Sequence, residues 1–240
     1  MPTALITGAS AGLGRALATE LATLGWRLVL TARGAQRLEQ VAADLPHQVS
    51  VTTIAGDVAD PEHRSRVVAE INRAGALDVL VNNASTLGPT PLRPLAALSP
   101  AELSDVLAVN LIAPFALTAA LLPALTAARG VLLDISSDAG VEHYPDWGGY
   151  GASKAALDHL TLTFGQENLE IACYAVDPGD MRTDMQQAAF PGEDISDRRS
   201  PASVVPALLE LISSRPPNGR YRAADIGAAM GASRASAVAG

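Results

Sequence analysis

Tyr150 and Lys154 have the residue types and the spacing to share one proton-transfer site. They stand four residues apart in a segment typical of a helix start, so both side chains would lie on one face, one turn apart. A free tyrosine phenol has a pKa of about 10, and a neighbouring ammonium favours the phenolate. We therefore expect Lys154 to lower the pKa of Tyr150, which would act as a general acid/base. Lys154 is also the only lysine in the chain, although an accidental pair at an exposed helix start is the alternative.

Alternating strand-like and helix-like segments run from end to end of the chain and would position these side chains. The apolar runs predict strands at Thr3–Thr7, Arg27–Ala32, Val49–Ala55, Val79–Asn82, Val131–Ser136, Ile171–Val176 and Gly219–Ala224. Helices are predicted between them, at about Leu13–Leu24, Ala35–Asp44, Pro61–Ala74, Pro100–Ala127, Gly151–Asn168 and Pro201–Ser213. This alternation predicts an α/β protein with a Rossmann-like, doubly wound parallel sheet of about seven strands and helices on both faces. The length of 240 residues fits a single domain over residues 1–240.

A glycine-rich turn joins the first predicted strand to the first predicted helix. Backbone N–H groups and the positive end of a helix dipole converge at such a turn and can bind a phosphate group. Glycine is needed where a Cβ atom would collide with the ligand. In the first unit of a doubly wound fold the turn predicts a dinucleotide site, with a plain tight turn as the alternative. The residues expected to bind there are Gly8, Ser10, Gly12, Leu13 and Gly14.

The end of the second predicted strand bears on the choice of dinucleotide. In this fold an acidic residue there binds the ribose 2′-hydroxyl of NAD(H), whereas an arginine accommodates the 2′-phosphate of NADP(H). The sequence reads Thr31-Ala32-Arg33 and has no carboxylate there. Because the guanidinium of Arg33 can donate a planar fork of hydrogen bonds to a phosphate, we expect NADP(H) in preference to NAD(H). The chain has sixteen arginines, so an exposed, solvated Arg33 is the alternative.

The Gly-x-x-x-Gly-x-Gly spacing of this turn resembles the cofactor turn of the short-chain dehydrogenase/reductase family, and the resemblance extends over most of the chain. Asp57-Val58 resembles the family's adenine-ring contact. Asn82-Asn83-Ala84 resembles its Asn-Asn-Ala-Gly motif, which implies that Asn83 and Ala84 lie beside the nicotinamide half of the cofactor. The fourth position of that motif is Ser85 here and glycine in the family.

The resemblance also covers a catalytic set. The segment Ile135-Ser136-Ser137-Asp138-Ala139-Gly140 is similar to the family's catalytic serine segment, and the family's usual distance to tyrosine assigns that role to Ser137. Its hydroxyl would donate to the substrate oxygen. Asn110 resembles the family's catalytic asparagine, whose backbone distorts the helix and holds a water near the lysine. The resemblance thus implies a catalytic site of Asn110, Ser137, Tyr150 and Lys154, in which Tyr150 and Lys154 also contact the cofactor.

The segment after the sixth predicted strand is similar to the family's Pro-Gly segment and includes Pro178, Gly179, Met181 and Thr183. The resemblance implies that these residues contact the cofactor and that Thr183 binds the nicotinamide carboxamide. The stretch Asp177–Ser200 shows no clear periodicity. A loop of that length in a compact domain is more often a binding loop or lid than a spacer, so we expect it to cover the substrate.

The family resemblance implies an NADP(H)-dependent oxidoreductase that transfers hydride between the nicotinamide and a carbonyl or alcohol carbon of a small molecule, as a ketone or aldehyde reductase. Two alternatives stay open at this point. One is a non-catalytic, NADP(H)-binding regulatory protein, and the other is an epimerase or dehydratase that retains its cofactor. The resemblance further implies a homodimer or homotetramer built on the predicted helices Pro100–Ala127 and Gly151–Asn168.

Composition bears on the remaining partners. A formal net charge of −8 leaves no basic surplus for binding nucleic acid or an anionic membrane surface. The single cysteine, Cys173, and a start without a signal-peptide pattern lead us to expect a cytoplasmic protein. The uncharged stretch Val106–Ala128 is long enough to cross a bilayer, but its Asn, Pro and Thr residues favour a buried helix. The four histidines share no metal-site spacing, so no metal is expected.

Overall fold

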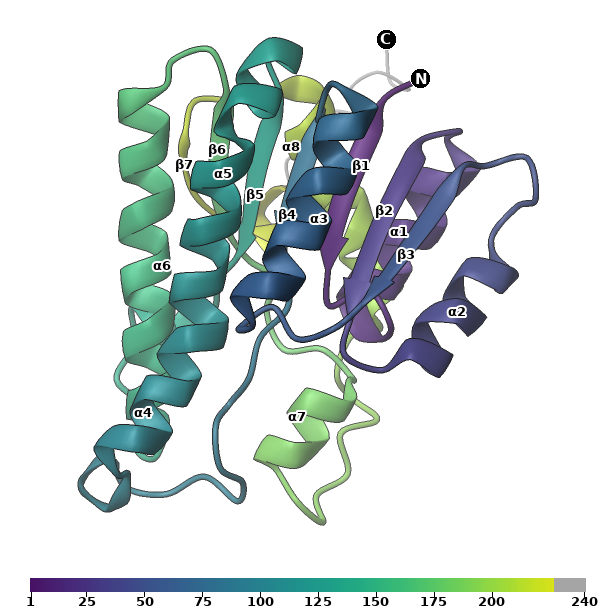
Figure 1. Ribbon diagram of the computed structural model, residues 1–240. Coiled ribbons are helices and arrows are strands. Elements are labelled where there is room, and N and C mark those ends of the chain that lie inside the picture. Colours follow the sequence, from purple (N-terminus) through teal and green to yellow (C-terminus); the bar gives the residue numbers. More distant parts are fainter. Residues whose placement is uncertain (227–240) are drawn as a thin grey trace, which may run out of the picture.

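Within residues 1–226, the part of the chain that the computed structural model describes, one parallel sheet is flanked by helices (Figure 1). Its seven strands are β1 (Thr3–Thr7), β2 (Arg27–Ala32), β3 (Val51–Ala55), β4 (Val79–Asn82), β5 (Val131–Ile135), β6 (Ala172–Asp177) and β7 (Gly219–Arg222). They lie in the order β3-β2-β1-β4-β5-β6-β7, and every neighbouring pair is parallel. This arrangement confirms the predicted fold class. The predicted single domain also includes residues 227–240, which lie outside the described part.

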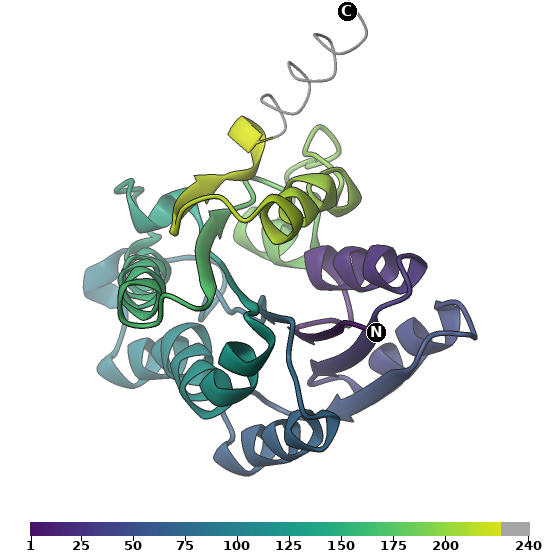
Figure 2. The ribbon, with the colours of Figure 1, turned by 90° about the horizontal axis from the view of Figure 1, so that it is seen from above.

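Helices cover both faces of the sheet, as the view from above in Figure 2 shows. One face carries α1 (Gly12–Thr23), α2 (Ala35–Asp44) and α8 (Val205–Ser214). The other face carries α3 (Pro61–Ala74), α5 (Ala113–Ala128) and α6 (Gly148–Glu167), with α4 (Pro100–Leu107) leading towards α5. The short helix α7 (Asp184–Ala189) belongs to neither layer and lies beyond the carboxyl ends of the strands (Figure 1). These carboxyl ends are therefore the open edge of the sheet.

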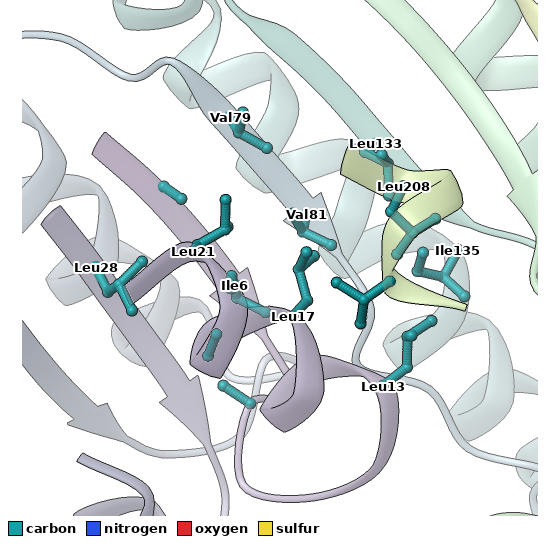
Figure 3. Close-up of a cluster of buried hydrophobic side chains, with 14 of the residues drawn as sticks. Ile6, Leu13, Leu17, Leu21, Leu28, Val79, Val81, Leu133, Ile135 and Leu208 are labelled. Carbon is teal, nitrogen blue, oxygen red and sulfur yellow. The ribbon is translucent and has the colours of Figure 1, made fainter. Parts of the chain in front are cut away.

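Alternate residues of the buried strands pack against the two helical layers. Ile6 of β1 lies in the core cluster that includes Leu13, Leu17 and Leu21, which follow one another at every fourth position of α1 (Figure 3). Its neighbour Leu5 packs in the opposite cluster, with buried residues of α3 and α5. Because both faces are covered, the inner strands are apolar at successive positions, which is the pattern that made them recognisable in the sequence.

The predicted helix over Pro100–Ala127 is interrupted. A π-helical turn at Ala108–Ile112 separates α4 from α5. The whole helical stretch is long and apolar enough to cross a membrane by length and composition alone. However, Leu117, Leu121 and Leu125 of α5 are buried in the core cluster shared with α3 and the sheet. Packing in the core therefore accounts for the apolar side of α5.

Two further differences from the prediction concern segments that border the open edge of the sheet. Helix α6 begins at Gly148 instead of Gly151, which places Tyr150 inside its first turn. The predicted loop Asp177–Ser200 contains α7, whose first turn is capped by the Thr183 side chain. A helix of only six residues has too few turns to produce a visible apolar periodicity, so the sequence pattern did not reveal it.

Buried polar side chains join β4, β5, α5 and α6. Asp134 of β5 accepts hydrogen bonds from Asn82 Nδ2 at 2.7 Å and from Thr161 Oγ1 at 2.6 Å. Asn82 Nδ2 also donates to Thr118 Oγ1 at 3.2 Å. Burial raises the pKa of Asp134 to about 6, although the hydrogen bonds from Thr161 and Asn82 and the charge of Lys154 oppose the shift. This carboxyl group therefore connects the two central strands to α6 just below the open edge.

Replacement of Asp134 by asparagine should make the stability of the fold less dependent on pH. Burial raises the pKa of the folded-state carboxyl from 3.8 to about 6, so the folded protein binds this proton more tightly than the unfolded chain. The stabilisation is present at low pH and is lost as pH rises through about 4 to 6, by up to about 3 kcal/mol. Asp134→Asn has no carboxyl group at this position, so its stability does not fall over this pH range for this reason. Its free energy of unfolding, measured by urea denaturation relative to wild type, should therefore rise by up to that amount between about pH 4 and pH 7.

The matched control is Asp105→Asn, because Asp105 is exposed on α4. Its free energy of unfolding should follow the wild-type pH dependence. If Asp134→Asn also ran parallel to wild type across that range, the raised pKa of Asp134 would be contradicted.

Candidate active site

A cleft of about 1150 Å³ opens at the carboxyl edge of the sheet, between the strand ends and α7. From β1 the chain adds strands on one side up to β3, and from β4 it adds strands on the other side up to β7. Open parallel sheets bind ligands outside the carboxyl ends of the strands where the strand order switches in this way. The predicted site residues that line the cleft are Gly8, Ser10, Gly12, Leu13, Arg33, Asp57, Val58, Asn83, Ala84, Ser137, Tyr150, Lys154, Pro178, Gly179, Met181 and Thr183. Gly14 and Asn110 do not line it, because both are buried behind its wall.

Two glycines let the turn before α1 pack closely against the segment after β4. Gly8 has a left-handed backbone with φ +66°, and a Cβ atom there would lie 2.8 Å from Asn83 Nδ2. A Cβ atom on Gly14 would lie 2.6 Å from the same nitrogen. Asn83 uses this space to donate to Thr7 O at 2.9 Å and to Gly8 O at 3.2 Å. The N-cap residue of α1 is Ala11, which has no side-chain acceptor, so the first backbone N–H groups of α1 remain available to a phosphate.

Arg33 and Arg37 lie at the end of the cleft formed by β2 and α2. Arg33 is exposed and follows β2 directly. Arg37, in the first turn of α2, pairs with Asp184 of α7 at 3.4 Å, and both side chains are largely exposed. The nearby carboxylate of Asp57 accepts a hydrogen bond at 2.9 Å from a backbone N–H of its own turn. This end of the cleft therefore offers two guanidinium groups, of which sequence reasoning identified only Arg33.

Tyr150 and Lys154 reach the cleft from neighbouring turns of α6. Lys154 Nζ lies 5.6 Å from the centre of the Tyr150 ring and donates a hydrogen bond to Ile135 O at 2.7 Å. The lysine is only 2% exposed. Burial lowers the pKa of Lys154 to about 8, while the charges of Asp134 and Asp158 raise it. The predicted proximity of the two side chains is therefore present in the fold.

The predicted lowering of the pKa of Tyr150 is wrong for the folded chain. Burial raises the pKa of Tyr150 to about 12, and hydrogen bonding by Ser137 and Ser85 opposes this only in part. The physical reason is that Lys154 directs its hydrogen bond to the Ile135 carbonyl, so removal of the phenol from water dominates. At neutral pH the phenol accordingly keeps its proton and can act as a proton donor.

Ser137 comes two residues after the end of β5 and lines the cleft with Tyr150, and hydrogen bonding by its hydroxyl lowers the pKa of the phenol. Its Oγ donates to Asp138 Oδ1 at 3.0 Å and accepts from Ala139 N at 3.2 Å. Tyr144 Oη donates to the other carboxylate oxygen, Asp138 Oδ2, at 3.0 Å. Asp138 therefore orients the serine hydroxyl, a role that sequence reasoning did not find, because only the turn Asp138–Gly140 brings these groups together.

Asn110 lies in the π-helical turn and is completely buried. Its Oδ1 accepts hydrogen bonds from Thr86 N at 2.8 Å and from Ser85 Oγ at 3.1 Å. Its Nδ2 donates to Thr86 O at 2.8 Å and to Ser153 Oγ at 3.0 Å. Ser153 Oγ in turn donates to Tyr150 O at 2.6 Å. The Asn110 amide thus connects the loop after β4 to the turn of α6 that carries the phenol.

The segment after β6 forms the remaining side of the cleft. Thr183 accepts a hydrogen bond from Gln186 N at 3.1 Å and so caps α7. The methyl group of Thr183 lies beside the glycine turn, since a Cβ atom on Gly12 would be 3.4 Å from Thr183 Cγ2. The predicted contact of the Pro-Gly segment with the cofactor is therefore compatible with its place in the fold.

An apolar wall adjoins Tyr150. Trp147 meets the Tyr150 ring edge-on, with ring centres 5.7 Å apart, and lies 6.0 Å from the ring centre of Phe190. Leu87 and Met185 belong to the same cluster. The end of the cleft next to the phenol is therefore suited to the carbon skeleton of a small molecule.

The donors along the cleft fit a nicotinamide dinucleotide. Two guanidinium groups stand at one end, the backbone N–H groups at the start of α1 stand in the middle, and the groups of Ser137, Tyr150 and Lys154 stand at the other end. The middle site suits a pyrophosphate, because a helix N-terminus carries partial positive charge. Residues of the cleft would therefore hold the cofactor along its whole length.

Known proteins resemble this chain in sequence. Residues 2–194 match the family model described as short chain dehydrogenase. The uncharacterised oxidoreductase YciK of Escherichia coli K12 is 32% identical over 221 residues, which cover 87% of this chain and 84% of YciK. Sepiapterin reductase of Meriones unguiculatus is 34% identical over 199 residues, which cover 77% of this chain and 76% of that enzyme.

Solved structures agree with these relatives. The structure of YciK from Escherichia coli superposes with a TM-score of 0.86 and 31% identity, and the match covers 92% of this chain and 94% of YciK. The alcohol dehydrogenase of the archaeon Thermococcus sibiricus, complexed with 5-hydroxy-NADP, gives a TM-score of 0.83 at 31% identity over 92% of this chain and 95% of that one. By sequence, fold and the arrangement of its cleft, the chain belongs to the short-chain dehydrogenase family.

Proposed function

We propose that this protein is an NADP(H)-dependent oxidoreductase that transfers hydride between the nicotinamide and a carbonyl or alcohol carbon, acting as a ketone or aldehyde reductase on a small molecule. The observation that carries this proposal is the buried phenol of Tyr150, with a pKa of about 12, in the same cleft as Ser137, Lys154 and the glycine turn. Carbonyl reduction consumes a proton at the substrate oxygen. A phenol that remains protonated at neutral pH can supply it.

The chain's own residues would orient the substrate and move the proton, while a bound nicotinamide cofactor supplies the hydride. Tyr150 donates its phenolic proton to the carbonyl oxygen as the alcohol forms. Ser137 donates a hydrogen bond to the same oxygen once its hydroxyl turns away from Asp138. Rotation of the serine hydroxyl does not leave the carboxylate without a partner, because Asp138 Oδ1 keeps a hydrogen bond from Ala139 N at 2.8 Å.

Lys154 and Asn110 would act after proton transfer, when Tyr150 is a phenolate. The Lys154 ammonium stands 5.6 Å from the ring centre, where its positive charge would favour the phenolate, and in our proposal the same ammonium would hold the nicotinamide ribose. The π-helical turn at Ala108–Ile112 interrupts the regular hydrogen bonding of the helix. In our proposal, the backbone at Asn110 holds a water there, through which the tyrosine recovers its proton.

Arg33 and Arg37 support the choice of NADP(H). Both line the same end of the cleft, and Arg33 follows β2 at the position that discriminates between the two cofactors in this fold. A 2′-phosphate would bring a doubly charged group to these two guanidinium groups. The complex of the Thermococcus sibiricus enzyme with 5-hydroxy-NADP points in the same direction.

We also propose that the protein is a cytoplasmic homodimer or homotetramer. Ile112 and Phe115 near the start of α5 are 50% and 45% exposed. Phe115 lies 6.1 Å from the ring centre of Phe164 on α6, so exposed apolar surface continues across two adjacent helices. Such a surface suits burial against a second copy of the chain.

The proposed function is tested by mixing the protein and NADPH with a panel of structurally diverse ketones and aldehydes, while NADPH oxidation is followed by absorbance. Turnover of at least one compound is the expected result. Tight NADPH binding without turnover of any compound would instead favour a regulatory binding protein. Isotope exchange without net loss of NADPH would favour an epimerase or dehydratase.

Tyr150→Phe should abolish reduction of a carbonyl compound while leaving NADPH binding near the wild-type value. The substitution removes only the hydroxyl that donates the proton, and general acid catalysis contributes roughly 10²–10⁴-fold to kcat. Steady-state kinetics measure the loss, and fluorescence titration measures the dissociation constant of NADPH. Tyr221→Phe is the control, because Tyr221 Oη donates to Pro217 O outside the cleft. A wild-type kcat in Tyr150→Phe would show that the phenol is not the proton donor.

Arg33→Asp should raise the KM for NADPH by roughly 10- to 100-fold, because it replaces a charged hydrogen-bond donor by a carboxylate that repels the 2′-phosphate. The KM for NADH should change little, since NADH lacks that phosphate. Both constants are measured with the same carbonyl compound. Arg129→Asp is the control for the change in net charge, because Arg129 is exposed at the end of α5. Equal effects on the two cofactors would contradict the assignment of Arg33.

A further inference from the structure

Ser85 stands where the motif of the family has glycine, and its hydroxyl lies inside the active site. The residue lines the same cleft as Tyr150, Ser137 and Lys154. Its Oγ donates a hydrogen bond to Asn110 Oδ1 at 3.1 Å, and hydrogen bonding by Ser85 lowers the pKa of the Tyr150 phenol. A glycine at this position would supply neither contact. Ser85 therefore adds a polar group between the proposed acid/base and the buried asparagine.

The Asn110 side-chain amide, which accepts the hydrogen bond from Ser85, is held rigidly. Asn110 is completely buried, and its Nδ2 donates to Thr86 O at 2.8 Å and to Ser153 Oγ at 3.0 Å. Its Oδ1 also accepts from Thr86 N at 2.8 Å. The Asn110 oxygen therefore keeps a hydrogen bond even when the Ser85 hydroxyl turns elsewhere, so rotation of that hydroxyl leaves no buried acceptor unsatisfied.

We propose that Ser85 is a positioning residue of the active site, whose rotatable hydroxyl joins the Tyr150 phenol to the buried Asn110 amide and holds the phenol oxygen during proton transfer. This rests on the proposed role of Tyr150 as the acid/base. As the phenolic proton passes to the substrate oxygen, Ser85 turns its single proton from Asn110 Oδ1 to the phenol oxygen. Serine gives up no proton in this step. Its hydroxyl only changes acceptor, and the new acceptor carries the growing negative charge.

The direction of the effect follows from the charge on the acceptor. A hydroxyl that donates to a phenolate stabilises the charged form, and hydrogen bonds to charged groups are stronger than those to neutral ones. Ser85 therefore lowers the pKa of Tyr150, in opposition to the burial that raises it. Removal of the hydroxyl should raise that pKa further and weaken the hold on the phenol oxygen.

The test uses the full chain saturated with NADP⁺ and labelled with ¹³Cζ-tyrosine, and follows the titration by NMR. The chain has four tyrosines, and Tyr150→Phe identifies the resonance of Tyr150. In Ser85→Ala, the onset of the change towards the phenolate shift should move by about one unit to higher pH. Ser85→Gly, which restores the residue of the family motif, should show the same displacement. The dissociation constant of NADPH should stay within about twofold of wild type in both variants.

Ser104→Ala is the control, because Ser104 Oγ donates to Pro100 O on the exposed side of α4. Its titration should coincide with that of wild type. A wild-type titration in Ser85→Ala would overturn the proposal, and so would a displacement seen only in Ser85→Gly, since that would assign the effect to the Cβ atom. For a ketone that the wild type reduces, the pH above which kcat falls should move in the same direction as the titration. Absence of turnover with every carbonyl compound would refute the proposed function, while the titration would still decide the role of Ser85.

Discussion

Lys154 places its ammonium 2.7 Å from the carbonyl oxygen of Ile135, almost entirely removed from water, and the geometry of the site follows from that contact. A buried ammonium is costly unless hydrogen bonds and opposite charges compensate it. The carbonyl at the end of β5 and the carboxyl groups of Asp134 and Asp158 provide this compensation. Helix α6 must therefore lie against the end of β5, which brings Tyr150 beside Ser137. In the folded chain the lysine determines where the phenol lies more than how acidic it is.

Buried amides hold the loops around this helix in a similar way. Asn83 connects the turn before α1 to the end of β4, and Asn110 connects the following loop to α6. Because a buried polar group without a partner is costly, each amide admits few alternative loop positions. The side of the cleft formed by α7 is tied less firmly, since the ion pair Arg37–Asp184 is largely exposed and such pairs contribute little to stability. The cleft therefore has one well-fixed wall and one that can adjust.

The strands and most cleft residues could be predicted from the sequence because their signals are local. Apolar runs mark strands covered on both faces, and the glycine turn carries its own spacing. The apolar pattern does not reveal the π-helical turn at Ala108–Ile112, since a single added residue per turn barely alters it; only the family resemblance implied a distorted helix at Asn110. The pKa of Tyr150 was predicted in the wrong direction because spacing shows that Lys154 is near but does not show burial or the direction of its hydrogen bond. The contact of Ser85 with Asn110 joins residues 25 positions apart and depends on how a loop folds back.

The close packing of the glycine turn also limits how this sequence can change over evolutionary time. The space that a side chain at Gly14 would need already holds the amide nitrogen of Asn83, because a Cβ atom there would lie 2.6 Å from it. The same Cβ atom would also lie 2.6 Å from the backbone oxygen of Gly8, so shortening the Asn83 side chain alone would not make room for it. Descendants of this protein are therefore expected to keep Gly14, because another residue there would require the backbone of the turn itself to move.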